Sequence, residues 1–182
     1  MTLSDWANIA QIVAAISVAG SLAFVGIQLH YNTKSNRAST LQMNANYWLQ
    51  YLTAMADPQL SKVYSMGAAG RKEIEQGEFV QFFFLCRATF MGCENQHYQY
   101  LSGLIDDKAY AGYEQTIKEQ IAAFPGIRAM WQMVRHTYGP EFVKFMDLMV
   151  AQVPTHASSS ACNTWKTLVE QQRRDPASER GE

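Results

Sequence analysis

The sequence lacks the motifs by which many enzymes are recognised. It has no glycine-rich phosphate loop, no G-x-S-x-G motif, no H-E-x-x-H motif and no zinc-finger spacing. Its formal net charge of −1 gives no electrostatic reason to expect a nucleic-acid partner. The basic pair Arg173-Arg174 near the C-terminus is interleaved with Glu170 and Asp175. We therefore expect no enzyme activity, no cofactor and no nucleic-acid binding.

Cysteine is also scarce. The three residues, Cys86, Cys93 and Cys162, are odd in number and widely separated. This is not the pattern of a disulfide framework. Buried free thiols in a reducing compartment explain it better.

Charge is low overall and absent from one long stretch. Charged residues make up 17% of the chain, against about 25% in typical soluble domains. No charged residue lies between Asp5 and Lys34, and apolar residues dominate Trp6–Gln28. About 20 such residues, at about 1.5 Å each, span the roughly 30 Å hydrocarbon core of a bilayer. Segment 1–33 therefore predicts a transmembrane helix with its flanks, and a lipid bilayer as partner.

Two other interpretations of this stretch stay open. A cleaved signal peptide needs basic residues before the apolar run, and the residues MTLSD before Trp6 contain none. A buried helix of a soluble protein would explain the polar residues inside the stretch. These are Asn8, Gln11, Ser17, Ser21 and Gln28.

The charges beside the apolar stretch predict its orientation. Asp5 is the only charged side chain before it, whereas Lys34 and Arg37 follow it. Positive residues are retained on the cytoplasmic side of membranes. We therefore expect the N-terminus outside and the C-terminal domain in the cytoplasm.

Small and polar residues form two opposite faces of this helix, at 100° per residue. One face holds Asn8, Ala15, Ala19 and Gly26, and the other holds Ala14, Ser17, Ser21 and Gln28. Small residues let membrane helices approach closely, and polar side chains in lipid favour partners. The pattern predicts contacts on both sides, in a homo-oligomer or with other membrane subunits. Chance is the alternative, because alanine, glycine and serine are common in membrane helices.

The remainder of the chain contains no strand pattern, so we expect an all-α fold. Segment 34–56 predicts a juxtamembrane amphipathic helix, and segment 57–153 an α-helical cytoplasmic domain, in a bundle of about five helices. Segment 154–182 is expected to be a tail with a short helix around Trp165 and a disordered end of ten residues. The apolar stripe of the juxtamembrane helix is Leu41, Ala45, Trp48, Leu52 and Met55.

Local signals mark where the bundle helices begin. Asp57-Pro58 is typical of an N-cap followed by proline at the first helical position. It predicts a short helix through Tyr64, which Gly67 and Gly70 are expected to end. Asp106 is expected to cap a helix from 107 to about 124, and Pro125 and Pro140 to begin two more. The expected inner face of the first is Tyr110, Tyr113, Ile117 and Ile121, and that of the helix from Pro125 is Ile127, Met130, Trp131 and Val134. A long buried helix is expected after Gly77, before the helix that Asp106 caps. Its predicted face is Phe79, Phe83, Cys86, Phe90, Cys93, His97, Tyr100 and Leu104, broadened by Phe82 and Leu101.

The order of these features resembles a family of uncharacterised bacterial membrane-anchored proteins. The resemblance rests on Ile9-Ala10-Gln11-Ile12-Val13 in the apolar stretch and, later, on Pro125-Gly126, Trp131 and Pro140-Glu141-Phe142. Further matching residues are Arg87, Glu94, His97 to Tyr100, Gly103, Leu104 and Asp106. It implies membrane anchorage in a bacterial inner membrane and a helical domain, and it implies no catalytic residue.

One spacing in the long helix is typical of metal sites. Glu94-x-x-His97 places both side chains on one helix face, as in dinuclear metal bundles. Such a site needs a second pair, and the sequence has none. Cys86 and Cys93 lie on the same helix face as His97. Together the three side chains would supply three of the four ligands of a structural zinc site. The alternative is structural, because Arg87 lies seven residues before Glu94 and is placed to form a buried ion pair with it.

The expected function is that of a single-pass membrane-anchored assembly or interaction subunit. It would associate with itself or serve as an accessory subunit of a membrane complex. One alternative is a pore-forming homo-oligomer. The other is a metal- or ligand-binding helical bundle that uses Glu94 and His97.

Overall fold

A computed structural model describes residues 2–155 and 160–174, and these residues form helices and turns without any strand. The all-α expectation is confirmed. The α-helices are α1 (Leu3–Met55), α2 (Pro58–Ala68), α3 (Gln76–Leu101), α4 (Asp107–Ile117), α5 (Pro125–Val134), α6 (Pro140–Gln152) and α7 (Ser160–Arg174). Two short elements join them, the π-helix η1 (Lys118–Ala122) and the 3₁₀-helix η2 (Arg135–Thr137).

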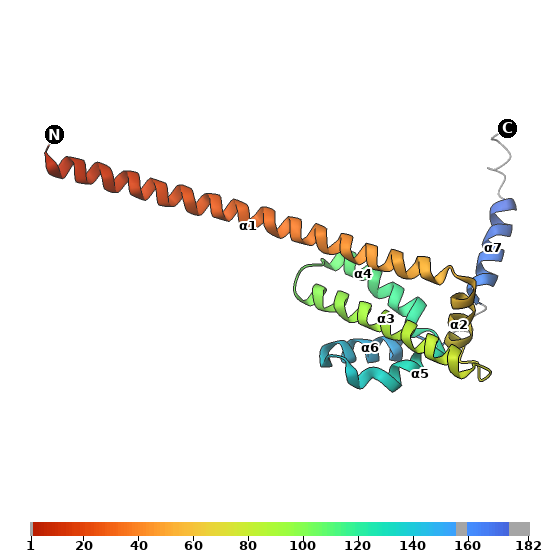
Figure 1. Ribbon diagram of the computed structural model, residues 1–182. Coiled ribbons are helices and arrows are strands. Elements are labelled where there is room, and N and C mark those ends of the chain that lie inside the picture. The colour runs from red at the N-terminus through yellow and green to blue at the C-terminus, as the bar shows by residue number, and fades with distance from the viewer. Residues whose placement is uncertain (1, 156–159, 175–182) are drawn as a thin grey trace. The chain divides into compact units, whose positions relative to one another are not determined.

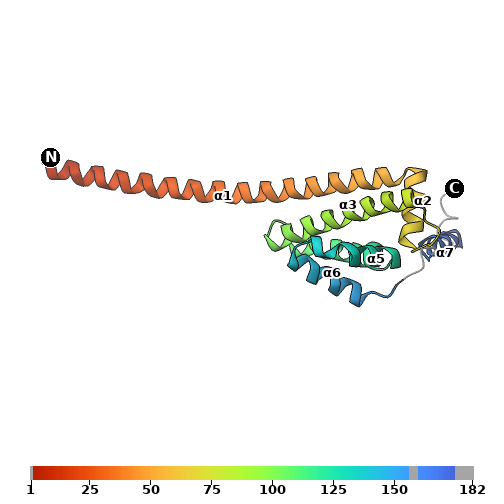
Figure 2. The same cartoon turned by 60° about the horizontal axis from the view of Figure 1, so that its bottom comes forward.

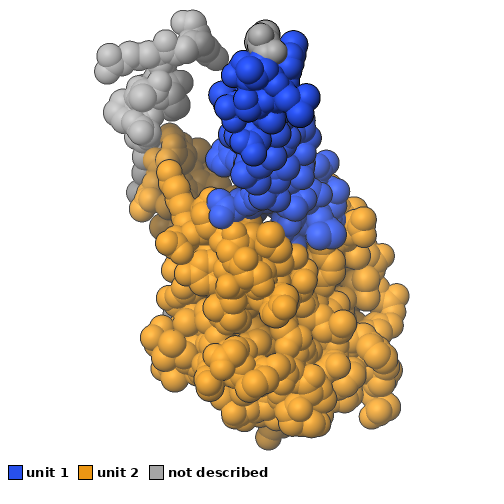
Figure 3. Space-filling view, turned by 90° about the vertical axis from the view of Figure 1, so that its left-hand side faces the viewer, with its two compact units in different colours: residues 1–46 blue, residues 47–182 orange. Residues whose placement is uncertain are grey.

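The chain divides into two compact units, residues 1–46 and 47–182, which Figure 3 colours separately. The first unit is the N-terminal part of α1, which is α-helical throughout, including residues 33–36. The boundary falls inside the predicted juxtamembrane segment 34–56, because the last turns of α1 belong to the bundle. Tyr47, the first residue of the second unit, donates a hydrogen bond from its hydroxyl to the Ala88 carbonyl at 2.6 Å.

Helix α3 is the centre of the second unit and contacts α2, α4, α5 and α6. Figures 1 and 2 show it lying alongside α5 and α6. Phe90 and Cys93 in its middle are completely buried. Around them lie Val63, Phe82, Cys86, Ile117, Ile121, Ile127, Met130, Trp131, Phe142, Met146 and Met149.

The ends of α3 follow from local chemistry. The Glu78 carboxylate accepts a hydrogen bond from the Glu75 backbone N–H at 3.1 Å, which satisfies a free donor at the helix start. After the helix, Gly103 adopts φ +71°, and the Leu104 N–H returns to the Gln99 carbonyl at 2.9 Å. Leu101 is therefore in the last turn and is exposed. Its predicted place in the buried face was wrong.

The predicted N-cap of α2 is confirmed. The Asp57 carboxylate accepts hydrogen bonds from the Gln59 and Leu60 backbone N–H groups, at 2.9 and 3.0 Å. The helix ends at Ala68, later than the predicted Tyr64, and Gly70 follows with φ +68°.

Substituting this cap gives a first testable prediction. Asp57→Ala is expected to lower the free energy of unfolding by about 1 kcal/mol, because the two N–H groups lose their acceptor. Asp57→Asn keeps an acceptor oxygen and is the matched control, with a loss of less than about half that amount. Chemical unfolding followed by near-UV circular dichroism measures both, and equal losses would contradict the cap's role.

The predicted helix 107–124 is interrupted. Asp106 caps α4 through the Ala109 N–H at 2.8 Å, and Tyr110, Ile117 and Ile121 are buried as expected. From Lys118 to Ala122, however, the chain forms the π-helix η1. The carbonyl of Ala122 at its end accepts a hydrogen bond from the Nε of Arg128 at 2.6 Å.

Prolines begin α5 and α6, as predicted. The expected inner residues of α5, Ile127, Met130, Trp131 and Val134, are all buried. The short helix expected around Trp165 is α7, which runs through Arg174. The rest of the predicted disordered end, residues 175–182, lies outside the described residues.

The predicted apolar stripe of 34–56 is only partly correct in the second unit. Trp48 and Met55 are half-buried, but Leu52 is 59% exposed. Tyr51 is turned inward instead, because its hydroxyl is hydrogen-bonded to Thr89 of α3 at 3.0 Å.

Candidate functional site

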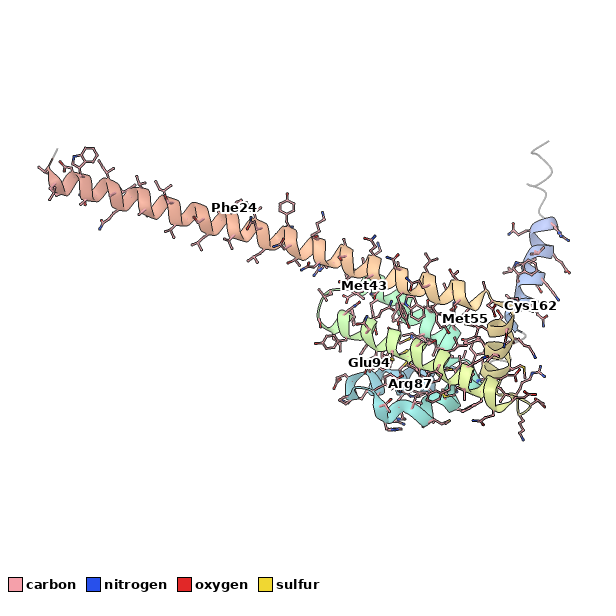
Figure 4. The ribbon with its side chains drawn as sticks, viewed as in Figure 1. Phe24, Met43, Met55, Arg87, Glu94 and Cys162 are labelled. Atoms are coloured by element: carbon pink, nitrogen blue, oxygen red, sulfur yellow. The ribbon has the colours of Figure 1, made fainter. Side chains whose placement is uncertain are left out.

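The first unit contains one helix that is long and apolar enough to cross a membrane. None of its 18 most apolar consecutive residues is buried. Ile16 and Leu22 are each about two-thirds exposed, at 67% and 68%. Phe24, labelled in Figure 4, is 59% exposed. The described part of the chain therefore leaves a continuous apolar surface uncovered along this stretch.

The polar side chains of this stretch differ in whether they have a hydrogen-bond partner within the chain. The hydroxyls of Ser17 and Ser21 donate to the carbonyls of Val13 and Ser17, both at 2.8 Å. These serines are thus satisfied within their own helix. The amides of Asn8 and Gln28 have no hydrogen-bond partner in the described part of the chain. Only the amides therefore favour a partner from outside.

The predicted pair Arg87 and Glu94 share a face of α3 (Figure 4), but the structure gives each a different partner. The guanidinium of Arg87 donates to the Thr137 hydroxyl and lies over the Tyr138 ring, 5.0 Å from its centroid. The Glu94 carboxylate accepts the Gly139 N–H at 2.7 Å. No ion pair joins the two side chains among the described residues. Both hold residues 137–139, which link η2 to α6.

The carboxylate of Glu94, a residue of α3, lies at the N-terminus of α6, because its hydrogen-bond partner Gly139 is the N-cap of that helix. A carboxylate in this position satisfies a free N–H and interacts favourably with the helix dipole. Arg87 stabilises the same segment through its contact with an aromatic ring. The geometry assigns both residues a structural role.

His97 contacts residues other than Glu94. Its Nδ1 is 2.5 Å from the Tyr110 hydroxyl, and its ring stacks on Phe145 at 4.4 Å between centroids. Desolvation by burial lowers the pKa of His97, which favours the neutral imidazole. Glu94 and His97 therefore form hydrogen bonds with different residues, Gly139 and Tyr110. In the described residues no group of three His, Cys, Asp or Glu side chains is placed to hold a metal ion.

The three thiols fall into two classes. Cys86 and Cys93 are buried, and burial raises the pKa of both thiols to about 12. Cys162 in α7 is exposed. Because the thiolate is the reactive form, the buried pair is inert near neutral pH and Cys162 is accessible to reagents.

A cavity of about 330 Å³ lies within the second unit and was not predicted from the sequence. Four helical segments supply its walls: the end of α1, α2, α3, and α4 with η1. The lining residues are Trp48, Tyr51, Leu52, Tyr64, Thr89, Tyr113, Thr116, Ile117, Gln120 and Ile121. Trp48 and Leu52 had been assigned to the apolar stripe of 34–56, and Tyr113, Ile117 and Ile121 to the inner face of the helix 107–124. Helical spacing alone does not indicate that these residues border a hollow.

Burial affects the tyrosines of this cavity in the same way. Desolvation raises the pKa of Tyr51, Tyr64 and Tyr113 above the ordinary tyrosine value. Their hydroxyls therefore stay protonated at physiological pH and remain hydrogen-bond donors. The cavity is a neutral site with aromatic walls.

Comparisons of the chain with protein-family models, curated proteins and solved structures find no match. The bacterial membrane-anchored family suggested by the sequence pattern thus stays a prediction, and any function must be argued from the geometry.

Proposed function

We propose that this chain is a single-pass membrane protein that acts as an assembly or interaction subunit. The observation that carries the proposal is the uncovered apolar surface of Trp6–Gln28. An exposed apolar surface of this extent is unfavourable in water and marks an interaction site or a membrane segment. At about 1.5 Å per residue the stretch rises roughly 34 Å, enough for a hydrocarbon core of about 30 Å.

The proposed location is a bacterial inner membrane, with the N-terminus outside and the second unit in the cytoplasm. The flanking charges support it, since Lys34 and Arg37 follow the apolar stretch and only Asp5 precedes it.

Cys162 provides a direct test of this orientation, because it is the exposed thiol and the buried pair does not compete. A membrane-impermeant maleimide is expected to label the chain in lysed but not in intact bacterial spheroplasts. The matched control is Ser4→Cys in a Cys162→Ser background, which should be labelled to the same extent in intact and in lysed spheroplasts. Equal labelling of Cys162 before and after lysis would contradict the proposed orientation.

The partner surface is proposed to be the face that holds Asn8, Ala15, Ala19 and Gly26. The unpartnered amide of Asn8 supports this choice, because an amide in lipid is stabilised by a hydrogen bond to another helix. Self-association is the simplest version of the proposal. A different membrane subunit is the second version.

Two glycines make the self-association version testable. A Cβ added at Gly26 or at Gly20 meets no atom within 4 Å, so neither substitution disturbs the chain itself. Gly26 lies on the proposed face and Gly20 lies off both polar faces. Gly26→Leu is expected to weaken the oligomer by about tenfold or more, and Gly20→Leu by less than about twofold. Analytical ultracentrifugation in mild detergent measures the mass.

Two outcomes would count against self-association. The first is a parent protein that is strictly monomeric at all concentrations. The second is an equal response to both leucine substitutions, because a general effect of leucine in the lipid phase would explain it. A monomer that co-purifies with another membrane protein, and loses it on Gly26→Leu, would favour the accessory-subunit version.

A further inference from the structure

We propose that the cavity of the second unit binds a neutral two-ring aromatic molecule that carries one hydrogen-bonding group. All of its lining residues lie within 47–182. The inference is therefore independent of the proposed membrane function.

The size of the cavity sets the size of the ligand. Its volume of about 330 Å³ lies at the lower end of the roughly 300–1,000 Å³ found for ligand pockets. An engineered apolar cavity of about 150 Å³ holds one benzene ring. About twice that volume fits a fused two-ring molecule.

The walls determine the ligand's chemistry. The rings of Trp48 and Tyr113 lie 6.4 Å apart between centroids and are tilted by 52°, and Ile117 and Ile121 supply aliphatic surface. None of the described lining residues is charged. An ion in this site would lose hydration without gaining a counter-charge, which disfavours charged ligands. A flat, neutral aromatic molecule gains both apolar burial and ring contacts here.

Hydrogen-bonding groups at the cavity remain available. The Tyr64 hydroxyl and the Gln120 amide have no hydrogen-bond partner in the part of the chain that the structure describes. Thr89 is within 3.0 Å of both the Leu85 carbonyl and the Tyr51 hydroxyl. The Thr89 hydroxyl donates to the Tyr51 hydroxyl oxygen, and the Tyr51 proton has no acceptor among the described residues, so Tyr51 keeps donor capacity. A ligand hydroxyl or carbonyl therefore finds complementary groups.

The π-helix gives independent support. Single π-helical turns interrupt the regular hydrogen-bond ladder and occur frequently at functional sites. Here Ile121 and Ala122 of η1 are buried, while Gln120 of the same turn stays exposed at the cavity. This arrangement places an apolar wall and an amide side by side at the same site.

The test uses the full chain in lipid nanodiscs and 2-naphthol as the probe, with isothermal titration calorimetry as the readout. Empty nanodiscs provide the background for partition into lipid. We expect one 2-naphthol per chain above this background. We expect 2-naphthalenesulfonate, which has the same rings and a negative charge, to bind at least about tenfold more weakly.

Two variant pairs locate the binding. Leu52→Trp adds bulk to an exposed lining position and should weaken 2-naphthol binding by about tenfold or more. Leu49→Trp, equally exposed on α1 but outside the lining, is its control. Gln120→Glu should weaken binding by about fivefold, because it places a charge in the neutral site. Its control is Gln81→Glu on the surface of α3, which should change nothing.

Because Leu52 and Gln120 are exposed, near-UV circular dichroism should show intact folding in both variants. The proposal is overturned if 2-naphthol binds no more to the protein-loaded discs than to empty ones. It is also overturned if the members of each pair bind alike, or if the sulfonate binds as tightly as 2-naphthol.

Discussion

Gly126→Ala is expected to lower the free energy of unfolding of the second unit by about 3 kcal/mol or more. A Cβ at this position would collide with the Gly67 carbonyl oxygen and lie 3.0 Å from that of Ala68. Both atoms belong to the backbone of α2, so no side-chain rotation relieves the collision. The two helices would have to separate, and the packing of Ile127 and Val63 around them would loosen.

Gly112→Ala is the matched control. Gly112 lies inside α4, and a Cβ there meets nothing within 4 Å. Alanine should instead stabilise this helix by about 0.5–1 kcal/mol, because glycine is the more flexible residue in the unfolded chain. Urea unfolding followed by near-UV circular dichroism distinguishes the two. Similar losses for both substitutions would contradict the close approach of α2 and α5.

Trp131→Ala is expected to cost about 3–5 kcal/mol of unfolding free energy. Trp131 is 1% exposed, and its ring lies 5.2 Å from that of Phe90 and 5.7 Å from that of Phe142, between centroids. Its indole Nε1 donates to the Asp147 carboxylate at 2.9 Å. The substitution leaves a large cavity and removes one partner of Asp147, which keeps its ion pair with Arg135 at 2.5 Å.

Trp165 in α7 provides the comparison for this substitution. It is 63% exposed, so Trp165→Ala should change the unfolding free energy by less than about 0.5 kcal/mol. Chemical unfolding monitored by the near-UV signal measures both variants. A loss at Trp131 no larger than that at Trp165 would contradict its place in the core.

What could be predicted from the sequence was mainly local. Asp57 and Asp106 as caps, and Pro125 and Pro140 as helix starts, depend on a few neighbouring residues, so their signals survive in the sequence. The buried residues of α5 followed from helical spacing. The same spacing misassigned Leu52, because the hydroxyl of Tyr51 draws that residue inward to Thr89.

Features that depend on several segments were not predictable. The π-helix η1 has the composition of an ordinary helix. The side chain that donates to its Ala122 carbonyl, Arg128, comes from the next helix. The cavity exists because four segments meet there without filling the space. Likewise, spacing alone placed Arg87 and Glu94 on one face correctly. Their partners were decided by the short 3₁₀-helix that brings residues 137–139 against α3.

This last arrangement has a consequence for the response of the fold to ionic strength. Attraction between two exposed ions weakens strongly once added salt shortens the Debye length to about 3 Å at 1 M. Arg87 and Glu94 form no ion pair with each other, so the attraction that salt screens is not what holds them in place. Each contacts its partner directly, Glu94 through a backbone N–H at 2.7 Å and Arg87 through a hydroxyl and a ring face. Concentrated salt should therefore leave the junction between η2 and α6 closed.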